Sequence, residues 1–214
     1  MSTPIHQTEN MALPQILGLA PVMPVIVIED LAHAVPLAKA LVAGGLRVLE
    51  VTLRTPVAMQ AVAMIAAEVP EAVVGVGTLT RPEQFAEAEA VGAQFAVSPG
   101  LTSALVVASK QSAMPLLPGI FTPGEAMQAF EDGFRYLKLF PAKQAGGLGM
   151  LKALGGPLPE LSFCPTGGIS STDFRDYLAL PNVVCVGGSW VASLELMRAG
   201  DWQAITQLAA EATA

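Results

Sequence analysis

A lysine within an otherwise apolar segment is the residue of this sequence that most needs a chemical explanation. Lys138 lies in YLKLF (136–140), where it alternates with Leu137 and Leu139. Successive side chains of a strand point to opposite faces, so Lys138 points away from the face that the two leucines cover. A lysine is rarely buried alone, because removing its ammonium group from water is costly. The pattern indicates a structural ion pair, a side chain that reaches back to solvent, or a lysine used in chemistry.

Polar side chains also alternate with apolar ones in VLEVTLR (48–54). This alternation places Glu50, Thr52 and Arg54 on one face and the apolar residues on the other. If the apolar face packs against helices, the polar face points into the interior of the fold, where Glu50 is a candidate partner for Lys138. Arg54 has the planar geometry to bind a carboxylate through two hydrogen bonds, or it forms a surface ion pair.

A buried lysine beside a carboxylate is suited to carbon–carbon bond chemistry on a ketone. An uncharged lysine amine attacks the ketone carbon and forms a carbinolamine and then an imine, whose positive nitrogen stabilises an adjacent carbanion. The accompanying proton transfers require a carboxylate close to the imine, and Glu50 is the acidic side chain that the pattern places in the interior. Lys138 and Glu50 therefore form either a structural ion pair or the nucleophile and proton carrier that Schiff-base chemistry on a ketone requires.

Two glycine-rich segments near the end of the chain could hold an anion. TGGIS (166–170) and GGS (187–189) each follow an apolar run, and either could also be an ordinary turn. In parallel barrels, the loops after the last two strands often bind phosphate through backbone N–H groups, and small residues let the backbone approach the oxygen atoms. Ser189 could add a hydroxyl donor, whereas Ser170 is equally well explained as a helix cap. Thr78, at the end of GVGT, is either a donor to a carboxylate or an ordinary polar strand end.

These residues fall on a regular alternation of short β-branched runs and helical stretches rich in alanine and leucine. Such alternation implies a parallel sheet, and eight units in 214 residues favour a closed (β/α)8 TIM barrel over a doubly wound sheet. Lys138, Glu50 and Arg54 lie within or at the C-terminal ends of their strands, where barrel active sites are built. We expect a loose N-terminal tail over residues 1–15 and a single barrel domain over 16–214. The expected strands cover residues 22–28, 48–53, 72–78, 95–99, 115–120, 136–140, 161–167 and 183–189.

The charge and hydropathy of the chain limit its partners and location. A net charge of -7 disfavours nucleic acid and anionic membranes, because both reward dense lysine and arginine. No apolar run reaches the roughly 18 residues of a membrane span, and the first residues lack the pattern of a secretory signal. We therefore expect a soluble, cytoplasmic protein. A small anionic substrate is compatible with this charge only if a few local donors, such as Arg54 or backbone N–H groups, hold it.

The histidines and cysteines give no sign of a metal centre. Cys164 and Cys185 have no CxxC or histidine spacing, and each lies in an apolar run where a small buried side chain is expected. His6 lies in the expected tail and His33 in a helical stretch. Without clustered ligands, neither a metal nor another cofactor is predicted.

A series of short motifs extends over most of the chain. PVIVI, GGLRVLEVTLRT, VGVGT, GAQFAVSPG, PLLPGI, LKLFPA, FCPTGGIS and VGGSW occur in this order within residues 16–205. These motifs resemble the family of 2-dehydro-3-deoxy-6-phosphogluconate (KDPG) and 4-hydroxy-2-oxoglutarate (KHG) aldolases. The resemblance implies a metal-independent class I aldolase of the Entner–Doudoroff pathway that acts as a homotrimer. Its substrate would be KDPG, a small anionic phosphorylated 2-oxo acid that is cleaved to pyruvate and glyceraldehyde 3-phosphate, and KHG would be a further substrate.

The resemblance also implies roles for individual residues. Lys138 matches the lysine that forms the Schiff base, and Glu50 matches the glutamate that moves protons. No site position departs from the family pattern; the differences lie in the tail, at residues 121–123 and in the 142–149 loop. The pyruvate moiety would be held by Arg54, Thr78, Pro99 and Phe140, the aldol hydroxyl by Thr166, and the phosphate by Gly167, Gly168, Gly188 and Ser189.

Other functions are compatible with parts of this pattern. One is an aldolase for a different 2-oxo acid, such as the galactonate-derived epimer of KDPG. Another is a barrel that binds a phosphorylated metabolite without catalysis, although such a protein has no use for a buried lysine nucleophile. A metal-dependent pyruvate aldolase is the third, and it would lose its activity in the presence of a chelator.

Overall fold

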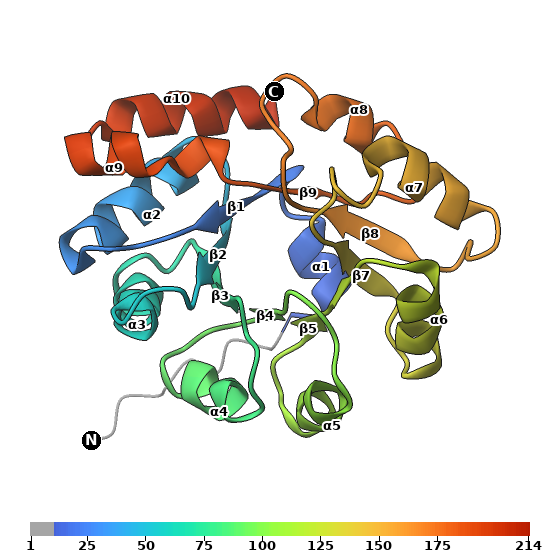
Figure 1. The fold of residues 1–214 in the computed structure, drawn as a ribbon. Helices are drawn as coiled ribbons and strands as arrows, with labels where there is room; N and C mark the ends of the chain where they lie inside the picture. Colours follow the sequence, from blue (N-terminus) through green and yellow to red (C-terminus); the bar gives the residue numbers. More distant parts are fainter. Residues whose placement is uncertain (1–10) are drawn as a thin grey trace.

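Strands and helices alternate along almost the whole chain. The computed structural model describes residues 11–214, and Figure 1 shows its fold. The strands are β1 (Val22–Ile26), β2 (Val48–Thr52), β3 (Val73–Gly77), β4 (Ala96–Val97), β5 (Leu116–Leu117), β6 (Gly119–Ile120), β7 (Tyr136–Leu139), β8 (Ser162–Pro165) and β9 (Val186–Gly188). The helices are α1 (Leu13–Leu17), α2 (Ala34–Ala43), α3 (Ala58–Glu68), α4 (Glu83–Ala90), α5 (Ser103–Gln111), α6 (Pro123–Glu131), α7 (Gly147–Gly155), α8 (Phe174–Leu178), α9 (Leu194–Ala199) and α10 (Trp202–Thr213), with 3-10 turns η1 (Leu31–His33) and η2 (Trp190–Ala192).

The strands are parallel and form two hydrogen-bonded sheets. One sheet has the order β5-β4-β3-β2-β1-β9, and the other has the order β6-β7-β8. Pro118 separates β5 from β6 within the expected strand 115–120, since a proline has no N–H for the ladder. Isolated bridges pair Phe163 with Val183 and Thr166 with Gly187, which brings β8 beside the segment that contains β9. The result is an α/β fold with a curled parallel sheet.

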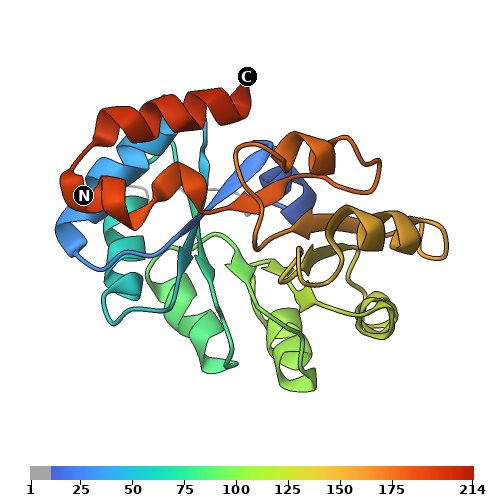
Figure 2. The same ribbon diagram turned by 45° about the horizontal axis from the view of Figure 1, so that its top comes forward.

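Helices α2 to α10 lie around the outside of the curled strands (Figures 1 and 2). The strand residues that alternate with Glu50 and Lys138 face these helices: Leu49, Val51, Leu137 and Leu139 are fully buried in the same apolar cluster as the helices. The alternation read from the sequence is confirmed for these two strands. No helix within residues 11–214 is long and apolar enough to cross a bilayer.

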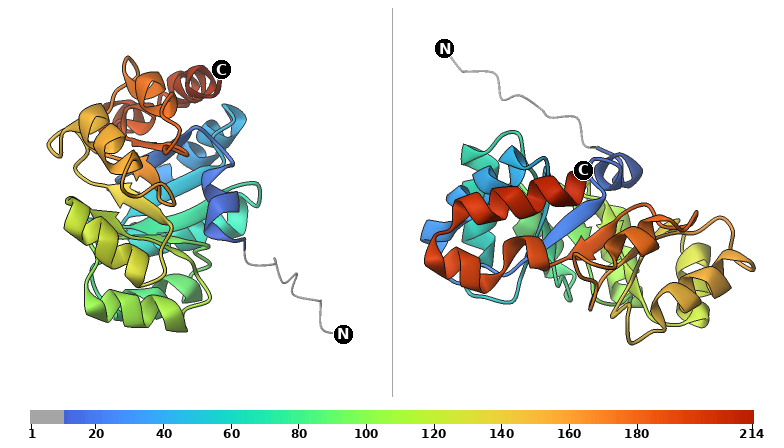
Figure 3. Two further views of the ribbon diagram at one scale, coloured as in Figure 1. Left: turned by 90° about the vertical axis from the view of Figure 1, so that its right-hand side faces the viewer. Right: turned by 90° about the horizontal axis from the view of Figure 1, so that it is seen from above.

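A second apolar cluster lies inside the curl of the strands. Figure 3 shows α1 at one end of the strands, on the side opposite the loops that follow β7 and β8. Two residues of α1, Ile16 and Leu17, pack there against the N-terminal parts of the strands. Glu50 and Lys138 lie two residues beyond Val48 and Tyr136, on the same strand faces and toward the C-terminal ends. We call the following residues the inner cluster: Ile16, Leu17, Met23, Val48, Val73, Phe95, Val97, Leu117, Cys164 and Cys185.

The N-terminal boundary differs in detail from the expected one. Residues 1–10 of the expected tail lie outside the described residues. Helix α1 begins at Leu13, before the expected start of the domain at residue 16, and Pro14 lies in its first turn. A helix of five residues is too short to produce a periodic pattern, so α1 was not predicted from the sequence.

Candidate active site

The predicted lysine–glutamate pair lies inside the curl of the strands. Nζ of Lys138, on β7, is 3.1 Å from Oε1 of Glu50, on β2, so the pair joins the two sheets. The two side chains are only 5% and 1% exposed. Nζ also lies 5.1 Å from the ring centroid of Phe140, within the range of a cation–π interaction. Lys138 therefore contacts two other predicted site residues.

The two carboxylate oxygens of Glu50 have different surroundings. Oε1 accepts the hydrogen bond from Lys138, whereas Oε2 is buried and has no hydrogen-bond partner among residues 11–214. Thr52, on the same strand, donates its hydroxyl to the carbonyl of Ile26 at 2.8 Å and leaves Oε2 alone. A buried carboxylate oxygen is costly without a partner, so this atom is available to accept a hydrogen bond from a bound molecule.

Arg54 and Thr78 meet where β2 and β3 end. Nε of Arg54 donates to Oγ1 of Thr78 at 3.1 Å, and the guanidinium is otherwise exposed to solvent. Thr78 has a φ of 59°, which is rare for a β-branched residue. Such strain persists only where the surroundings enforce it, and it is common at binding sites. The structure therefore forms the arginine–threonine pair that a carboxylate could bridge.

A cavity of about 490 Å³ opens beside these strand ends, a volume typical of small-molecule sites. Arg54 lies on its wall together with the glycine-rich loop, so a molecule with two separated anionic groups could reach both. Trp190 and the valines Val25 and Val27 supply apolar surface. The predicted site residues on the wall are Arg54, Phe140, Thr166, Gly167, Gly168 and Ser189.

The loop after β8 has a fixed shape. Gly167 and Gly168 have φ values of 103° and 81°, which favour glycine. The carbonyl of Thr166 accepts from the N–H of Ala142 at 2.8 Å, and that of Gly167 accepts from the N–H of Lys143 at 3.1 Å. Because α8 has only five residues, a helix dipole adds little here. The loop amides and the Ser189 hydroxyl are the donors available to an anion.

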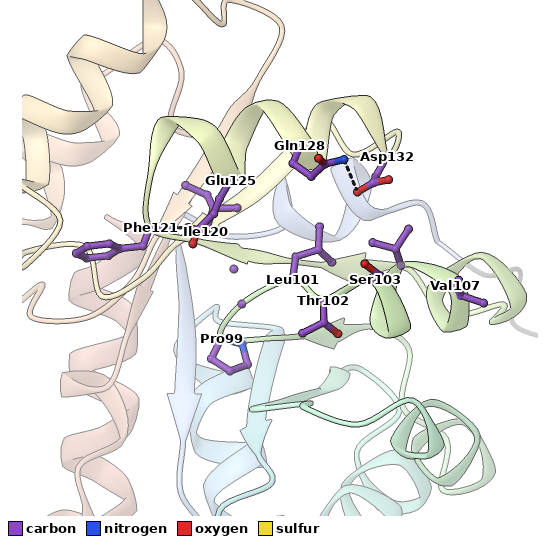
Figure 4. Close-up of a pocket in the computed structure, with 13 residues that line it drawn as sticks. Pro99, Leu101, Thr102, Ser103, Val107, Ile120, Phe121, Glu125, Gln128 and Asp132 are labelled. Atoms are coloured by element: carbon purple, nitrogen blue, oxygen red, sulfur yellow. Dashed lines mark hydrogen bonds between the residues drawn. The ribbon is translucent and has the colours of Figure 1, made fainter.

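Five predicted site residues are not on the wall of this cavity. Lys138 and Thr78 contact the wall residues Phe140 and Arg54, and Glu50 contacts Lys138. The other two are Pro99 and Gly188. Pro99 lines a separate cavity of about 510 Å³ beside α5 and α6, with Thr102, Phe121 and Gln128 among its other residues (Figure 4). Gly188 is buried in β9, where an added Cβ atom would overlap the ring of Trp190. Gly188 thus shapes the cavity wall through Trp190 and does not line the wall itself.

A surface ion pair that the sequence analysis did not single out braces the glycine loop. Nζ of Lys143 lies 3.0 Å from Oδ2 of Asp173, and Oδ1 of Asp173 accepts from the backbone N–H and the hydroxyl of Ser170 at 2.7 and 2.9 Å. Partial burial raises the pKa of Asp173, but these hydrogen bonds and the Lys143 ammonium outweigh it and hold the pKa below its usual value. The Ser-x-x-Asp spacing is the sequence signal that could have predicted the hydrogen bonds between Ser170 and Asp173.

We expect the Asp173→Asn variant to lose stability in a pH-dependent way. The native carboxylate has a lowered pKa, so its stabilising effect is complete above the unfolded value near 3.8 and disappears as the pH falls through the folded value. Because the pair is partly exposed, the loss at pH 7 should be below about 1 kcal/mol. Urea unfolding at pH 7 and pH 3 measures it, with Asp176→Asn on the exposed side of α8 as the control. An equal loss at both pH values would contradict this assignment.

The two cysteines lie in the inner cluster beneath the lysine–glutamate pair. Both are buried, as the sequence predicted. The interaction with Cys164 and burial raise the pKa of the Cys185 thiol well above its usual value. Within residues 11–214, no three histidine, cysteine, aspartate or glutamate side chains are grouped so that they could hold a metal ion.

Comparisons with known proteins place the chain in one family. The family model of KDPG and KHG aldolases matches residues 13–208. The 2-dehydro-3-deoxy-phosphogluconate aldolase of Dickeya dadantii is 56% identical over 200 residues, which cover 94% of each chain. The crystal structure of KDPG aldolase from Legionella pneumophila, with pyruvate captured as a covalent carbinolamine, has a TM-score of 0.93 and 46% identity over 95% of this chain and 99% of that one. The aldolase of Zymomonas mobilis ZM4 with 3-phosphoglycerate has a TM-score of 0.88 and 47% identity over 94% of each chain.

Fold, site and relatives together define an aldolase, that is, a lyase that breaks a carbon–carbon bond. The chain belongs to the KDPG and KHG aldolase family. The resemblance read from the short motifs is thereby confirmed.

Proposed function

We propose that the protein is a class I aldolase that cleaves KDPG to pyruvate and glyceraldehyde 3-phosphate in the Entner–Doudoroff pathway, and that it also accepts KHG. The buried contact of 3.1 Å between Lys138 and Glu50 carries this proposal. It supplies a nucleophile and a proton carrier at one point, which a binding protein without catalysis would not need. The names of the relatives, and the pyruvate and 3-phosphoglycerate in two of their structures, support the substrate class.

Lys138 and Glu50 perform the bond-breaking steps. The amine of Lys138 adds to the C2 carbonyl carbon, giving a carbinolamine that loses water to form the imine. Glu50 then takes the proton from the C4 hydroxyl as the C3–C4 bond breaks, and the electron pair of that bond moves into the imine to give an enamine. The aldehyde leaves, Glu50 returns the proton to C3, and water hydrolyses the imine to release pyruvate.

The remaining predicted residues hold the two ends of the substrate. Arg54 and Thr78 bind the carboxylate next to the imine carbon, and Phe140 covers the apolar side of the pyruvate moiety, with Pro99 near it. Thr166 contacts the aldol hydroxyl. The backbone N–H groups of the glycine loop and the hydroxyl of Ser189 hold the phosphate. Gly188 contributes indirectly, because it leaves room for the ring of Trp190 on the cavity wall. The phosphorylated end is thus recognised mainly by backbone donors.

We also propose that the strands form one closed (β/α)8 barrel within a single domain over residues 16–214, preceded by a tail. β5 and β6 belong to one segment that Pro118 interrupts, so they count as one strand of the barrel. The bridges from Phe163 and Thr166 to the β9 segment support closure on the other side. As the family resemblance implies, we propose that the protein is a homotrimer, and from its charge and hydropathy we propose that it is cytoplasmic.

Reductive trapping tests the function directly. The protein is incubated with pyruvate and borohydride, its intact mass is measured, and the modified tryptic peptide is mapped. We expect one reduced pyruvate adduct, on Lys138, and cleavage of KDPG that a chelator leaves unchanged. A folded protein that forms no adduct would instead favour the barrel that only binds a phosphorylated metabolite, and loss of activity with the chelator would favour the metal-dependent aldolase.

Replacing Arg54 with methionine should weaken pyruvate binding more than it slows chemistry. The variant loses a charged donor to the carboxylate, worth about 1.5 to 3 kcal/mol, so the KM for pyruvate in the condensation direction should rise by roughly 10- to 100-fold. Steady-state kinetics with varied pyruvate measure this change. Arg47→Met, next to the opposite end of β2, is the matched control and should behave as the wild type. A variant with normal KM and reduced kcat would assign Arg54 to another step.

A further inference from the structure

The neighbours of Glu50 and Thr166 include two glycines that the mechanism has not used. Gly77 ends β3, beside the β2 strand that carries Glu50, and Gly187 lies in β9, bridged to Thr166. Neither glycine has a left-handed backbone, so conformational freedom does not explain its presence. At both positions, the space that a side chain would occupy is filled by a predicted site residue, Glu50 or Thr166.

At Gly77, that space is filled by Glu50. A Cβ atom added to Gly77 would overlap Oε1 of Glu50, and it would lie 2.6 Å from Cγ and 2.7 Å from Cδ. Glu50 therefore passes over the bare backbone of β3 on its way to Lys138. Since Glu50 is completely buried, an alanine at Gly77 would force its carboxylate out of contact with the lysine.

Gly187 stands in the same relation to Thr166. An added Cβ atom there would overlap Oγ1 of Thr166 and would lie 2.8 Å from Cγ2 and 2.9 Å from Cβ. Thr166 is 4% exposed, and its Oγ1 also lies 3.4 Å from the carbonyl oxygen of Cys164, so its position is restricted on two sides. A methyl group at Gly187 would turn the hydroxyl away from its present direction.

We propose that Gly77 and Gly187 are positioning residues, each of which supplies the space that fixes one reactive side chain of the neighbouring strand. Gly77 sets the contact between Glu50 and Lys138, and Gly187 sets the hydroxyl of Thr166. The proposal rests on the proposed aldolase function. Neither turn formation nor contact with phosphate explains the glycines Gly77 in VGVGT and Gly187 in VGGSW, whereas this positioning role does.

The test compares Gly77→Ala with Gly187→Ala by two separate activities. Exchange of the C3 hydrogens of pyruvate with deuterated water requires the imine and Glu50, whereas cleavage of KDPG also requires the aldol hydroxyl to be held. We expect Gly77→Ala to reduce both rates by about 100-fold or more while pyruvate is still trapped on Lys138 by borohydride. Gly187→Ala should reduce cleavage and leave C3 exchange near the wild-type rate. Equal loss of both activities in both variants would overturn the assignment.

A double-variant cycle separates positioning from a general loss of structure. With Glu50 already truncated to alanine, nothing overlaps the new methyl group, so adding Gly77→Ala should cost no further activity. If the activity losses of the two single variants multiply in the double variant, the proposal is overturned. If Gly77→Ala alone does not fold, the Glu50→Ala/Gly77→Ala protein should fold, and its failure would likewise refute the overlap. Gly149→Ala, at an exposed position of α7 with open space, is the control and should retain full activity.

The aldolase function itself is checked independently on the wild-type protein. A pyruvate adduct on Lys138 with normal activity of Gly77→Ala would refute the positioning role alone. The absence of any adduct in the wild-type protein would refute the function on which that role depends.

Discussion

Replacing Lys138 with alanine is expected to reduce KDPG cleavage on the order of 10⁴-fold or more, because the variant lacks the amine that forms the imine. The borohydride adduct with pyruvate should disappear in the same variant. Both results have one physical cause, which is the loss of the only amine inside the described part of the fold that is buried next to a carboxylate. Steady-state cleavage assays and intact mass measure the two effects.

Stability must be measured beside activity in this variant. Removing Lys138 leaves Glu50 buried without its partner, and breaking a buried pair in this way costs about 3 to 5 kcal/mol. The Lys138→Ala/Glu50→Gln protein avoids the unpaired charge and should unfold at a higher temperature than Lys138→Ala while remaining inactive. Lys152→Ala, on the exposed side of α7, is the matched control. Unchanged turnover in Lys138→Ala would disprove the imine mechanism.

Replacing Glu50 with glutamine should have the second largest effect. The amide has nearly the same shape and can still hydrogen-bond to Lys138, but it cannot carry a proton between C4 and C3. We therefore expect kcat to fall by about 10²- to 10⁴-fold, whereas pyruvate should still be trapped on Lys138, although more slowly. Cleavage kinetics and the rate of borohydride trapping distinguish these two steps.

The comparison with Lys138→Ala makes the result specific. Glu50→Gln should retain the adduct that Lys138→Ala loses, and the C3 hydrogens of pyruvate should exchange with deuterated water far more slowly than in the wild type. Glu68→Gln, on the exposed side of α3, tests whether any loss of a carboxylate has this effect, and it should not. Exchange at the wild-type rate in Glu50→Gln would assign the proton transfers to another group.

The pair at the centre of the site could be predicted because it depends on local order in the sequence. Period-two alternation in β2 and β7 placed Glu50 and Lys138 on the inner faces, and parallel topology then brought them toward the same end of the fold. The eight strand segments were recognisable for the same reason. What alternation fixes is the direction of a side chain within its own strand.

Placement between segments was not accessible in this way. The Lys143–Asp173 pair joins two loops whose paths carry no periodic signal. In contrast, the break between α9 and α10 carries a local signal, because Gly200 has a φ of 66° that ends α9 and the side chain of Asp201 caps α10. Pro99 and Gly188 were assigned through the family resemblance. Whether either residue faces the cavity depends on the path of the Pro99 loop and on the packing of Trp190 over Gly188, which the sequence does not show.

The apolar packing around α1 closes one side of the site. Behind Lys138, on the side of the strands where α1 lies, the inner cluster fills the interior, so in the proposed mechanism both products leave on the other side. The aldehyde phosphate would depart first, because pyruvate stays covalently attached to Lys138 until water reaches the imine. Product release is therefore ordered, with the aldehyde first and pyruvate second. An excess of pyruvate can hold the enzyme in its covalent form, and an excess of the aldehyde alone cannot.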